Sequence, residues 1–167
     1  MPAPPSALAR EIKQTRPFRS KRQEAALALL KTVDLLRQRT GEVFEPFGVT
    51  DQQYNVLRIL RGAGAAGLPT LDIAGRMIEH APGITRLVDR LEKKGLVVRK
   101  RCTTDRRQVF CVLAPAGAKL LARMDAPVRQ MDGLLSALSE SEASTLVRLL
   151  DALRAGLHRP STSRRQA

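Results

Sequence analysis

The sequence is poor in aromatic residues, which make up 3% of its 167 residues and include no tryptophan. Strands of a β-sandwich draw on aromatic and β-branched side chains, so a core of leucine, valine, isoleucine and alanine favours packed helices. The longest apolar run, residues 25–30, is far shorter than the roughly 20 residues of a membrane-spanning helix. Residues 1–5 do not form a charged stretch followed by an apolar one, so no secretory signal is expected. The composition predicts a mainly α (α+β) fold and no membrane partner.

Cysteine is also scarce: the sequence has two, Cys102 and Cys111, which is too few for a disulfide framework. This usage favours a reducing cytoplasm. If a hairpin is centred between residues 104 and 105, Cys111 lies opposite about residue 98, so a disulfide between the two cysteines is not expected. Cys102 stands beside two basic residues, so a redox-sensing thiol stays open beside the interpretation of an ordinary thiol.

Motifs of common enzymes are missing as well. The sequence contains no glycine-rich phosphate loop, no H-E-x-x-H motif and no nucleophile elbow. Its two histidines, His80 and His158, are too few and too far apart for a zinc-type site. We therefore expect that the protein has no enzymatic activity and binds no metal ion or cofactor. The enzymatic alternative is a Ser-His-Asp triad, for which only these two histidines are available.

The sequence is rich in positive charge, with a formal net charge of +13 and a pI near 11.1. Such a balance attracts polyanions. The excess lies in residues 10–22 (net +5), 76–107 (net +6) and 154–167 (net +4). Basic tails are common solvated ends that add non-specific affinity, but the central segment needs an explanation in the fold. Because no aromatic residues are interleaved with the charges, double-stranded DNA is favoured over single strands, and an architectural or RNA-binding protein is the alternative.

Helical periodicity dominates the first part of the chain. Ser20 with Gln23 resembles a capping box and opens a helix expected to run to about Glu45. Thr50 with Gln53 forms a second capping box and opens the next helix. Further along we expect a loop over residues 62–67, a helix over 70–78 and a turn at His80 and Ala81. The next helix, over 82–94, is expected to begin at Pro82 and to stop at Gly95. Its buried side chains are expected to be Ile84, Leu87, Val88 and Leu91.

After Gly95 the hydrophobic period changes from 3.6 to 2. Residues 97–101 and 108–113 are predicted to be strands joined by a polar turn, with Pro115 and Gly117 ending the hairpin. The remainder is helical again, with a kink at Pro127 and a third capping box at Ser139 and Glu142. A short helix, a turn, a longer amphipathic helix and a basic hairpin form the winged helix-turn-helix pattern.

This pattern predicts a division of the chain. Residues 1–19 are expected to be a disordered basic tail, residues 49–115 a winged helix-turn-helix lobe, and residues 158–167 a basic C-terminal tail. Residues 20–48 and 116–157 carry leucine faces outside the lobe. We expect these faces to be buried in a symmetric dimer, although part of each face belongs to the core of the single chain.

The helix over 82–94 and the hairpin are the candidate DNA contacts. The solvent face of the helix carries Thr85, Arg86, Asp89, Arg90 and Lys93, and a major groove admits one α-helix whose arginines can bind guanine. The hairpin has Arg99, Lys100 and Arg101 before its turn and Asp105, Arg106 and Arg107 at the far end. A guanidinium there can enter a narrow minor groove or contact a phosphate. The alternatives are an ordinary solvated helix face and a solvated turn.

Three stretches resemble the MarR (multiple antibiotic resistance regulator) family: residues 48–60, residues 84–97 and Asp105-Arg106-Arg107. The likeness covers about residues 23–157. The combination of T-R-L-V-D-R-L-E-K-K-G-L-V with D-R-R at wing distance is specific. The resemblance implies a cytoplasmic, nucleoid-associated bacterial transcription regulator, most often a repressor. It also implies a homodimer on a pseudo-palindromic operator, released by a small phenolic or lipophilic effector.

The resemblance also implies roles for individual residues. Thr85 and Arg86 would face bases or phosphates, and Arg107, oriented by Asp105, would enter the minor groove beside Arg106. Where the family often has a hydroxyl residue at the start of the recognition helix, this chain has Pro82 and Gly83, so base contacts shift to other residues and Gly83 can bring its backbone to a phosphate. The predicted DNA-binding residues are His80, Gly83, Thr85, Arg86, Arg90, Lys93, Arg101, Arg106 and Arg107, with Asp105 orienting the wing.

Overall fold

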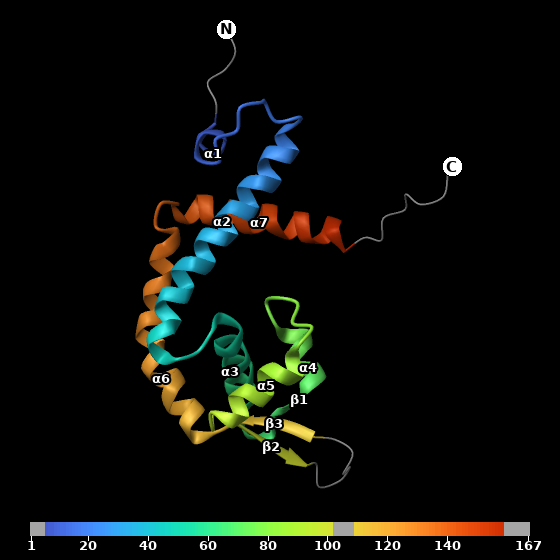
Figure 1. Ribbon diagram of the computed structural model, residues 1–167, viewed down its shortest axis with the longest axis vertical. Coiled ribbons are helices and arrows are strands. Elements are labelled where there is room, and N and C mark those ends of the chain that lie inside the picture. The colour runs from blue at the N-terminus through green and yellow to red at the C-terminus, as the bar shows by residue number, and fades with distance from the viewer. Residues whose placement is uncertain (1–5, 102–108, 159–167) are drawn as a thin grey trace, which may run out of the picture. The chain divides into compact units, whose positions relative to one another are not determined.

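The computed structural model describes residues 6–101 and 109–158 (Figure 1). The chain forms two compact units, Met1–Pro127 and Val128–Ala167. The first unit contains α1 (Ala7–Glu11), α2 (Lys21–Phe44), η1 (Glu45–Phe47), α3 (Asp51–Ala63), η2 (Gly64–Ala66), β1 (Leu68–Pro69), α4 (Thr70–Arg76), α5 (Ile84–Lys93), β2 (Val97–Arg101), β3 (Val109–Leu113) and most of α6 (Pro115–Gln130). The second contains the end of α6, η3 (Met131–Leu135) and α7 (Glu140–Leu157).

The N-terminal segment contains a helix where a disordered tail was expected. The Ser6 hydroxyl accepts a hydrogen bond from the Ala9 N–H at 3.3 Å and caps α1. Ala9 is buried, with 7% of its surface exposed. The prediction of a disordered tail over residues 1–19 is therefore wrong for this helix, because a short cap and one buried alanine fix a turn that shows no hydrophobic period. Residues 1–5 lie outside the described residues.

The starts of α2 and α3 follow the capping pattern of the sequence. Ser20 caps α2 by accepting from the Gln23 N–H at 3.1 Å, but the Gln23 side chain accepts from the Arg19 N–H, so this capping box is only half formed. At α3 the reciprocal box of Thr50 and Gln53 is complete, as predicted. Helix α3 continues to Ala63 and η2 follows it, so the loop expected over residues 62–67 is shorter than predicted.

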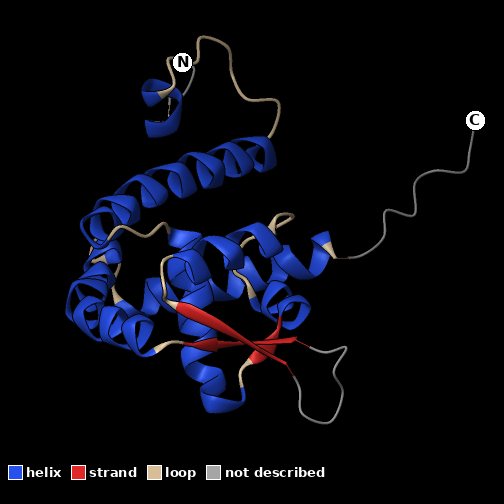
Figure 2. Ribbon diagram, turned by 60° about the horizontal axis from the view of Figure 1, so that its bottom comes forward, coloured by secondary structure: helices blue, strands red, loops and turns tan. Residues whose placement is uncertain are grey.

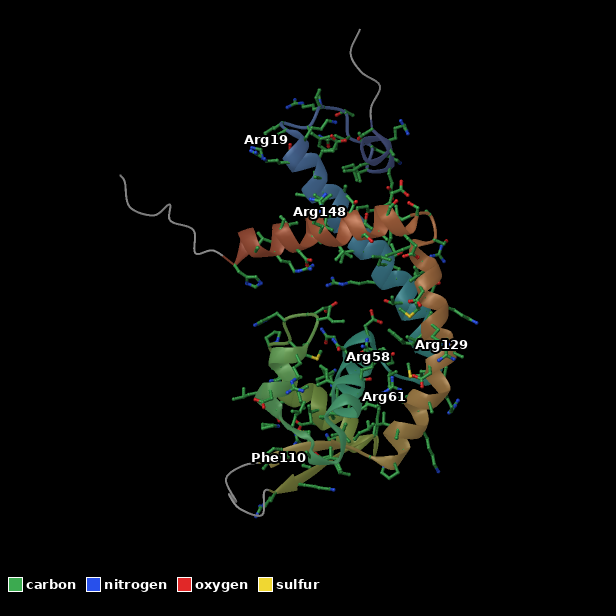
Figure 3. The ribbon with its side chains drawn as sticks, turned by 180° about the vertical axis from the view of Figure 1, so that it is seen from behind. Arg19, Arg58, Arg61, Phe110, Arg129 and Arg148 are labelled. Carbon is green, nitrogen blue, oxygen red and sulfur yellow. The ribbon has the colours of Figure 1, made fainter. Side chains whose placement is uncertain are left out.

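The core of the first unit lies among α3, α4, α5, the sheet and α6. Its largest fully buried side chains include Leu57 and Leu60 of α3, Ile73 of α4, Leu91 of α5, and Leu121 and Met124 of α6. The end of α2 joins this core through Phe44, whose ring stacks on Tyr54 at a centroid distance of 4.6 Å. Burial raises the pKa of Tyr54. On the outside, Arg61 of α3 and Asp125 of α6 form an ion pair of 2.9 Å (Figure 3).

Helix α5 begins at Ile84, two residues later than expected. The Ile84 N–H donates to the carbonyl of Ala81 at 3.1 Å, so residues 81–84 form a turn. Gly83 has φ −110° and ψ 31° and provides no side-chain cap. The prediction that Pro82 is the first helical residue is therefore wrong: Pro82 belongs to the turn.

The buried stripe and the end of α5 are as predicted. Ile84, Leu87, Val88 and Leu91 are all buried. Gly95 has φ +67°, and its N–H donates to Glu92 O at 2.8 Å while the Leu96 N–H donates to Leu91 O at 3.0 Å. These two bonds make a Schellman motif, whose left-handed position favours glycine.

The sheet has the order β1-β3-β2 and is antiparallel (Figure 2). The hairpin of β2 and β3 was predicted, but β1 was not, because two residues carry no periodicity. In the observed register Val97 pairs with Leu113 and Cys111 pairs with Arg99, not with residue 98. The expected hairpin centre was therefore wrong by half a residue.

Two glycines are required where other backbone comes close. A Cβ on Gly67, which has φ +67°, would lie 2.3 Å from the Cys111 carbonyl oxygen. A Cβ on Gly117 would lie 2.3 Å from the Leu96 carbonyl oxygen. Pro115 begins α6, so Gly117 lies in the first turn of that helix and packs it against Leu96, the residue just before β2.

The second unit is helical and presents an apolar face to solvent. Ser139 and Glu142 form the predicted capping box of α7. No residue of α7 is buried, and Val147, Leu149, Leu153 and Leu157 are exposed. Pro127 lies inside α6, and the kink expected at this residue stays a prediction.

Candidate nucleic-acid interface

One face of α5 is exposed and positively charged. Because the opposite face is buried in the core, Thr85, Arg86, Arg90 and Lys93 all point to solvent. We call these four residues the recognition face. None of its three basic side chains makes an ion pair or a hydrogen bond with any residue that the structure describes. Their charges are therefore available to an external anion.

The acidic residues of α5 are bound by one arginine of the wing. Arg99 of β2 donates to Asp89 Oδ1 at 2.6 Å and to Glu92 Oε2 at 2.5 Å. The hydrogen bond to Asp89 is the main cause that raises the pKa of Arg99 above its ordinary value. This clamp ties β2 to α5 and offsets one of the two negative charges that stand beside the recognition face.

Sequence reasoning grouped Arg99 with the DNA-facing cations of the hairpin and missed this clamp. Asp89 and Glu92 are three residues apart and so share one side of a helix. A basic residue in the strand that follows the helix, close to this acidic side, is the signal that points to such a clamp.

The C-terminal end of α5 is fastened to the beginning of α3. Lys94 Nζ donates to the Gly48 carbonyl at 2.5 Å and to Gln53 Oε1 at 3.4 Å. Gly48 has φ +67°, which turns the chain between η1 and α3. Lys94 therefore stabilises the fold at this end of the helix.

The beginning of α5 is left open. The Thr85 and Arg86 backbone N–H groups have no acceptor among the described residues, because Gly83 has no side chain to cap them. Two unpaired N–H groups at a helix N-terminus favour an anion. A small pocket of about 280 Å³ lies here, lined in part by Gln52, Gly83 and Arg90. His80, in the preceding turn, is exposed.

The wing is described only in part. Arg101 ends β2 and is exposed, as is Lys100. Asp105, Arg106 and Arg107 lie outside the described residues, and so does Cys102. Cys111 is buried, and its sulfur lies 3.7 Å from the Thr70 hydroxyl.

An open pocket of about 800 Å³ separates α2 from the helix-turn-helix. Glu79, in the turn before α5, accepts from Arg37 Nη2 of α2 at 3.0 Å and from Gln52 Nε2 of α3 at 3.3 Å. These three residues line the pocket together with Arg90 and Lys94. The turn that leads into the recognition helix is therefore attached to α2 across a charged pocket, a connection that sequence reasoning did not find.

Two further observations limit the chemistry of the described residues. They contain no group of three or more histidine, cysteine, aspartate or glutamate side chains that could hold a metal ion. Nor does any described helix have the length and apolar character to cross a membrane.

The fold and this surface define a winged helix-turn-helix protein, and known proteins agree. The MarR family model matches residues 49–109. A transcriptional regulatory protein for the hcr operon of Thauera aromatica is 37% identical over 118 residues, covering 70% of each chain. The chain therefore belongs to the MarR family, and it is a transcriptional regulator of the kind that its sequence predicted.

Solved structures give the same result. A MarR transcription factor from Planctomyces limnophilus is 43% identical, with a TM-score of 0.61 over 81% of this chain and 99% of that one. The complex of S. aureus MepR with DNA is 26% identical, with a TM-score of 0.70 over 77% and 96% of the two chains. NadR in complex with 4-hydroxyphenylacetate is 29% identical, with a TM-score of 0.62 over 83% and 97%.

Proposed function

We propose that the protein is a homodimeric repressor that binds a pseudo-palindromic duplex, with α5 in the major groove and the wing over residues 97–113 in the minor groove. One observation carries the proposal. The recognition face presents cations that pair with no residue in the described part of the chain, while Arg99 binds the acidic residues beside it. Helices of this kind contact base edges in the major groove and phosphates at its rims. MepR, a relative of the same fold, has been solved as a DNA complex.

Each predicted residue then has a role. Arg86 and Arg90 are assigned to bases, and Thr85 and Lys93 to bases or phosphates. The open N–H groups at the start of α5 are assigned to a phosphate, which Gly83 allows to approach closely. His80, Arg101, Arg106 and Arg107 complete the contact surface, and Asp105 orients the wing.

The dimer is supported by apolar side chains that lack a cover within their own unit. In the second unit Leu149 and Leu157 of α7 are 54% and 75% exposed, and in the first unit Leu30 of α2 is 66% exposed. Burying such faces between two copies removes the apolar surface from water. We assign residues 20–48 and 116–157 to the dimerisation region and residues 49–115 to the DNA-binding lobe.

The charged pocket beside Glu79 is the proposed effector site. NadR has been solved with 4-hydroxyphenylacetate, a phenolic acid. Because the pocket is lined by three basic residues and by the three acidic residues Glu45, Asp51 and Glu79, an effector with polar groups fits it better than a purely lipophilic one. We infer further that the protein acts on nucleoid DNA in the cytoplasm and catalyses no reaction.

The experiment that tests the function is selection of duplexes from a random pool, followed by competition binding at fixed salt. A regulator of this class is expected to prefer its selected palindrome to random duplex by about 10³-fold or more. Equal affinity for both would instead identify a non-specific architectural binder and would overturn the proposal.

A further inference from the structure

The strongest positive charge outside the proposed DNA-binding lobe lies in the segment before α2 and in the first turn of that helix. Lys13, Arg16, Arg19 and Arg22 are all exposed. Their side chains make no ion pair or hydrogen bond with the residues described by the structure. We call these four residues the N-terminal basic patch. The DNA-binding role of α5 does not use them.

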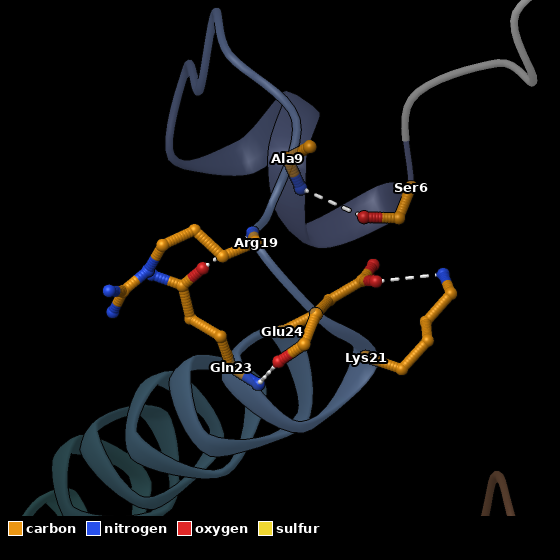
Figure 4. A network of polar contacts seen from close by, with 7 residues as sticks. Ser6, Ala9, Arg19, Lys21, Gln23 and Glu24 are labelled. Atoms are coloured by element: carbon orange, nitrogen blue, oxygen red, sulfur yellow. Dashed lines mark hydrogen bonds and ion pairs between the residues drawn. The ribbon is translucent and has the colours of Figure 1, made fainter.

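Hydrogen bonds hold the backbone at both ends of the segment that carries the patch (Figure 4). The cap from Ser6 holds α1, and the Gln14 N–H donates to the Ala9 carbonyl at 2.8 Å. At the other end the Arg19 N–H donates to the Gln23 side chain at 2.8 Å, which sets the entry into α2. The cations are therefore presented from a folded segment, which lowers the entropy that binding would cost.

The nearby carboxylates do not neutralise the patch, because they are bound elsewhere. Glu11 pairs with Lys31 of α2 at 3.8 Å. Glu24 pairs with Lys21 at 2.8 Å, and this contact, with a hydrogen bond from Ser6, lowers the pKa of Glu24. Within residues 6–101 and 109–158, four positive charges in a stretch of ten residues thus remain without a compensating carboxylate.

The length of α2 separates the patch from the recognition face. Helix α2 has 24 residues and is therefore about 36 Å long. The patch lies at its first residues, whereas the lobe is attached near its last residues, through Phe44 on Tyr54 and through Thr40 on Asp51. Figure 1 shows α1 beside the N-terminal end of α2 and α3 after its C-terminal end.

We propose that the N-terminal basic patch binds the phosphate backbone of a second DNA duplex while α5 holds the operator, so that the dimer bridges two segments of DNA. The inference rests on the proposed DNA-binding function. Lysine and arginine side chains neutralise phosphates and release counterions, which gives affinity without sequence information. A dimer carries two such patches, and each one is at the far end of α2 from its own recognition face.

A duplex fits this surface better than an anionic membrane does. Stable binding in a membrane interface combines basic residues with apolar surface buried among the lipids, as in an amphipathic helix with a broad apolar face. The residues between α1 and α2 are not helical. Their large apolar side chains are limited to Ile12, which is 39% exposed, and the half-buried Phe18.

The test is a bridging assay with the full-length dimer. Selected operator duplex is fixed to beads, protein is added, and capture of a labelled random-sequence duplex is measured. The test variant carries Lys13→Gln, Arg16→Gln and Arg19→Gln, three members of the patch outside the assigned dimerisation region. The control variant loses the same charge in the C-terminal basic tail, through Arg159→Gln, Arg164→Gln and Arg165→Gln.

We expect the parent and the control to capture the labelled duplex and the test variant to capture at least about tenfold less, while all three bind the operator alike. The log–log salt slope for capture should fall by up to about 0.9 for each phosphate contact that is lost.

If selection yields no operator, the proposed function fails before bridging is tested. The bridging inference is overturned if the parent captures no second duplex, if test and control variants behave alike, or if sedimentation shows that the test variant no longer forms a dimer. Binding of the patch to anionic lipid vesicles without capture of DNA would also overturn it.

Discussion

Arg99 in β2 donates to Asp89 on α5 at 2.6 Å, and its other terminal nitrogen reaches Glu92 one turn further along the same helix. A single wing residue therefore binds both carboxylates beside the surface that faces DNA and offsets one of their two negative charges. It also fixes the strand that leads to the wing tip against the recognition helix. Electrostatics of the recognition face and placement of the wing depend on the same side chain.

Replacement of Arg99 tests this arrangement. Arg99→Gln leaves Asp89 and Glu92 uncompensated near the phosphates, and each unit charge costs on the order of 1 kcal/mol at a water-like dielectric. We expect operator affinity to fall roughly tenfold or more in competition binding. The unfolding temperature should change little, because the pair is partly exposed to solvent.

The control is the triple variant in which Asp89→Asn and Glu92→Gln are added to Arg99→Gln. It removes the two carboxylates together with their partner, so affinity should recover most of the loss. If the triple variant binds as weakly as the single one, Arg99 contacts DNA directly and the clamp is not its role.

Local periodicity was enough to predict much of this fold. The apolar residues of α5, from Ile84 to Leu91, follow one helical stripe, and the alternation after Gly95 marks the hairpin. Such patterns are set by neighbouring residues in the chain. The start of α5 was misplaced because Pro82 fits both a first helical turn and an ordinary turn. The two-residue strand β1 has no pattern of its own and is defined only by its pairing with β3.

The sequence predicted which side chains of the candidate site are exposed, but not the ion pairs that connect the site to other elements. The recognition face follows from the stripe, because buried positions on one side leave Arg86 and Arg90 on the other. The contacts of Glu79 with Arg37 and of Arg99 with Asp89 join separate elements across the fold. Exposed charges have many possible partners in a sequence, and only the fold selects among them.

Base recognition and backbone contact should separate in two arginine variants. A bidentate arginine contributes about 1–3 kcal/mol of discrimination between bases. Arg86→Ala should therefore relax sequence preference at one position of each half-site. Arg107→Ala should weaken binding to all duplexes and reduce the salt slope by about 1. Selection and salt titration of both variants measure these effects. If both bind like the parent, the assigned contact surface is wrong.

The contact between Glu79 and Arg37 should affect DNA binding more than stability. Both side chains are substantially exposed, 35% and 58%, and such pairs contribute about 0–1 kcal/mol to folding. Glu79→Gln releases the turn before α5 from α2, so the free protein must order that turn on binding. We expect operator affinity to fall about fivefold with little change in unfolding temperature.

The matched variant exchanges the two charges, Arg37→Glu with Glu79→Arg. It should restore affinity if the ion pair itself positions the turn. A double variant that binds less tightly than either single variant would show that the two residues act separately.

Gly117 tests the joint between the hairpin and α6. Its Cβ in an alanine variant would lie 2.3 Å from the Leu96 carbonyl oxygen, which belongs to the backbone and cannot rotate away. Overpacking of this kind costs about 1–3 kcal/mol. Gly117→Ala should therefore lower the unfolding temperature by roughly 2–12 °C, at about 2–4 °C per kcal/mol for a chain of this size. Gly75→Ala is the matched control, because nothing lies within 4 Å of the added methyl group in α4. That change should raise stability by about 0.4–1 kcal/mol. Equal melting of the two variants by calorimetry would show that the approach of α6 to Leu96 does not constrain residue 117.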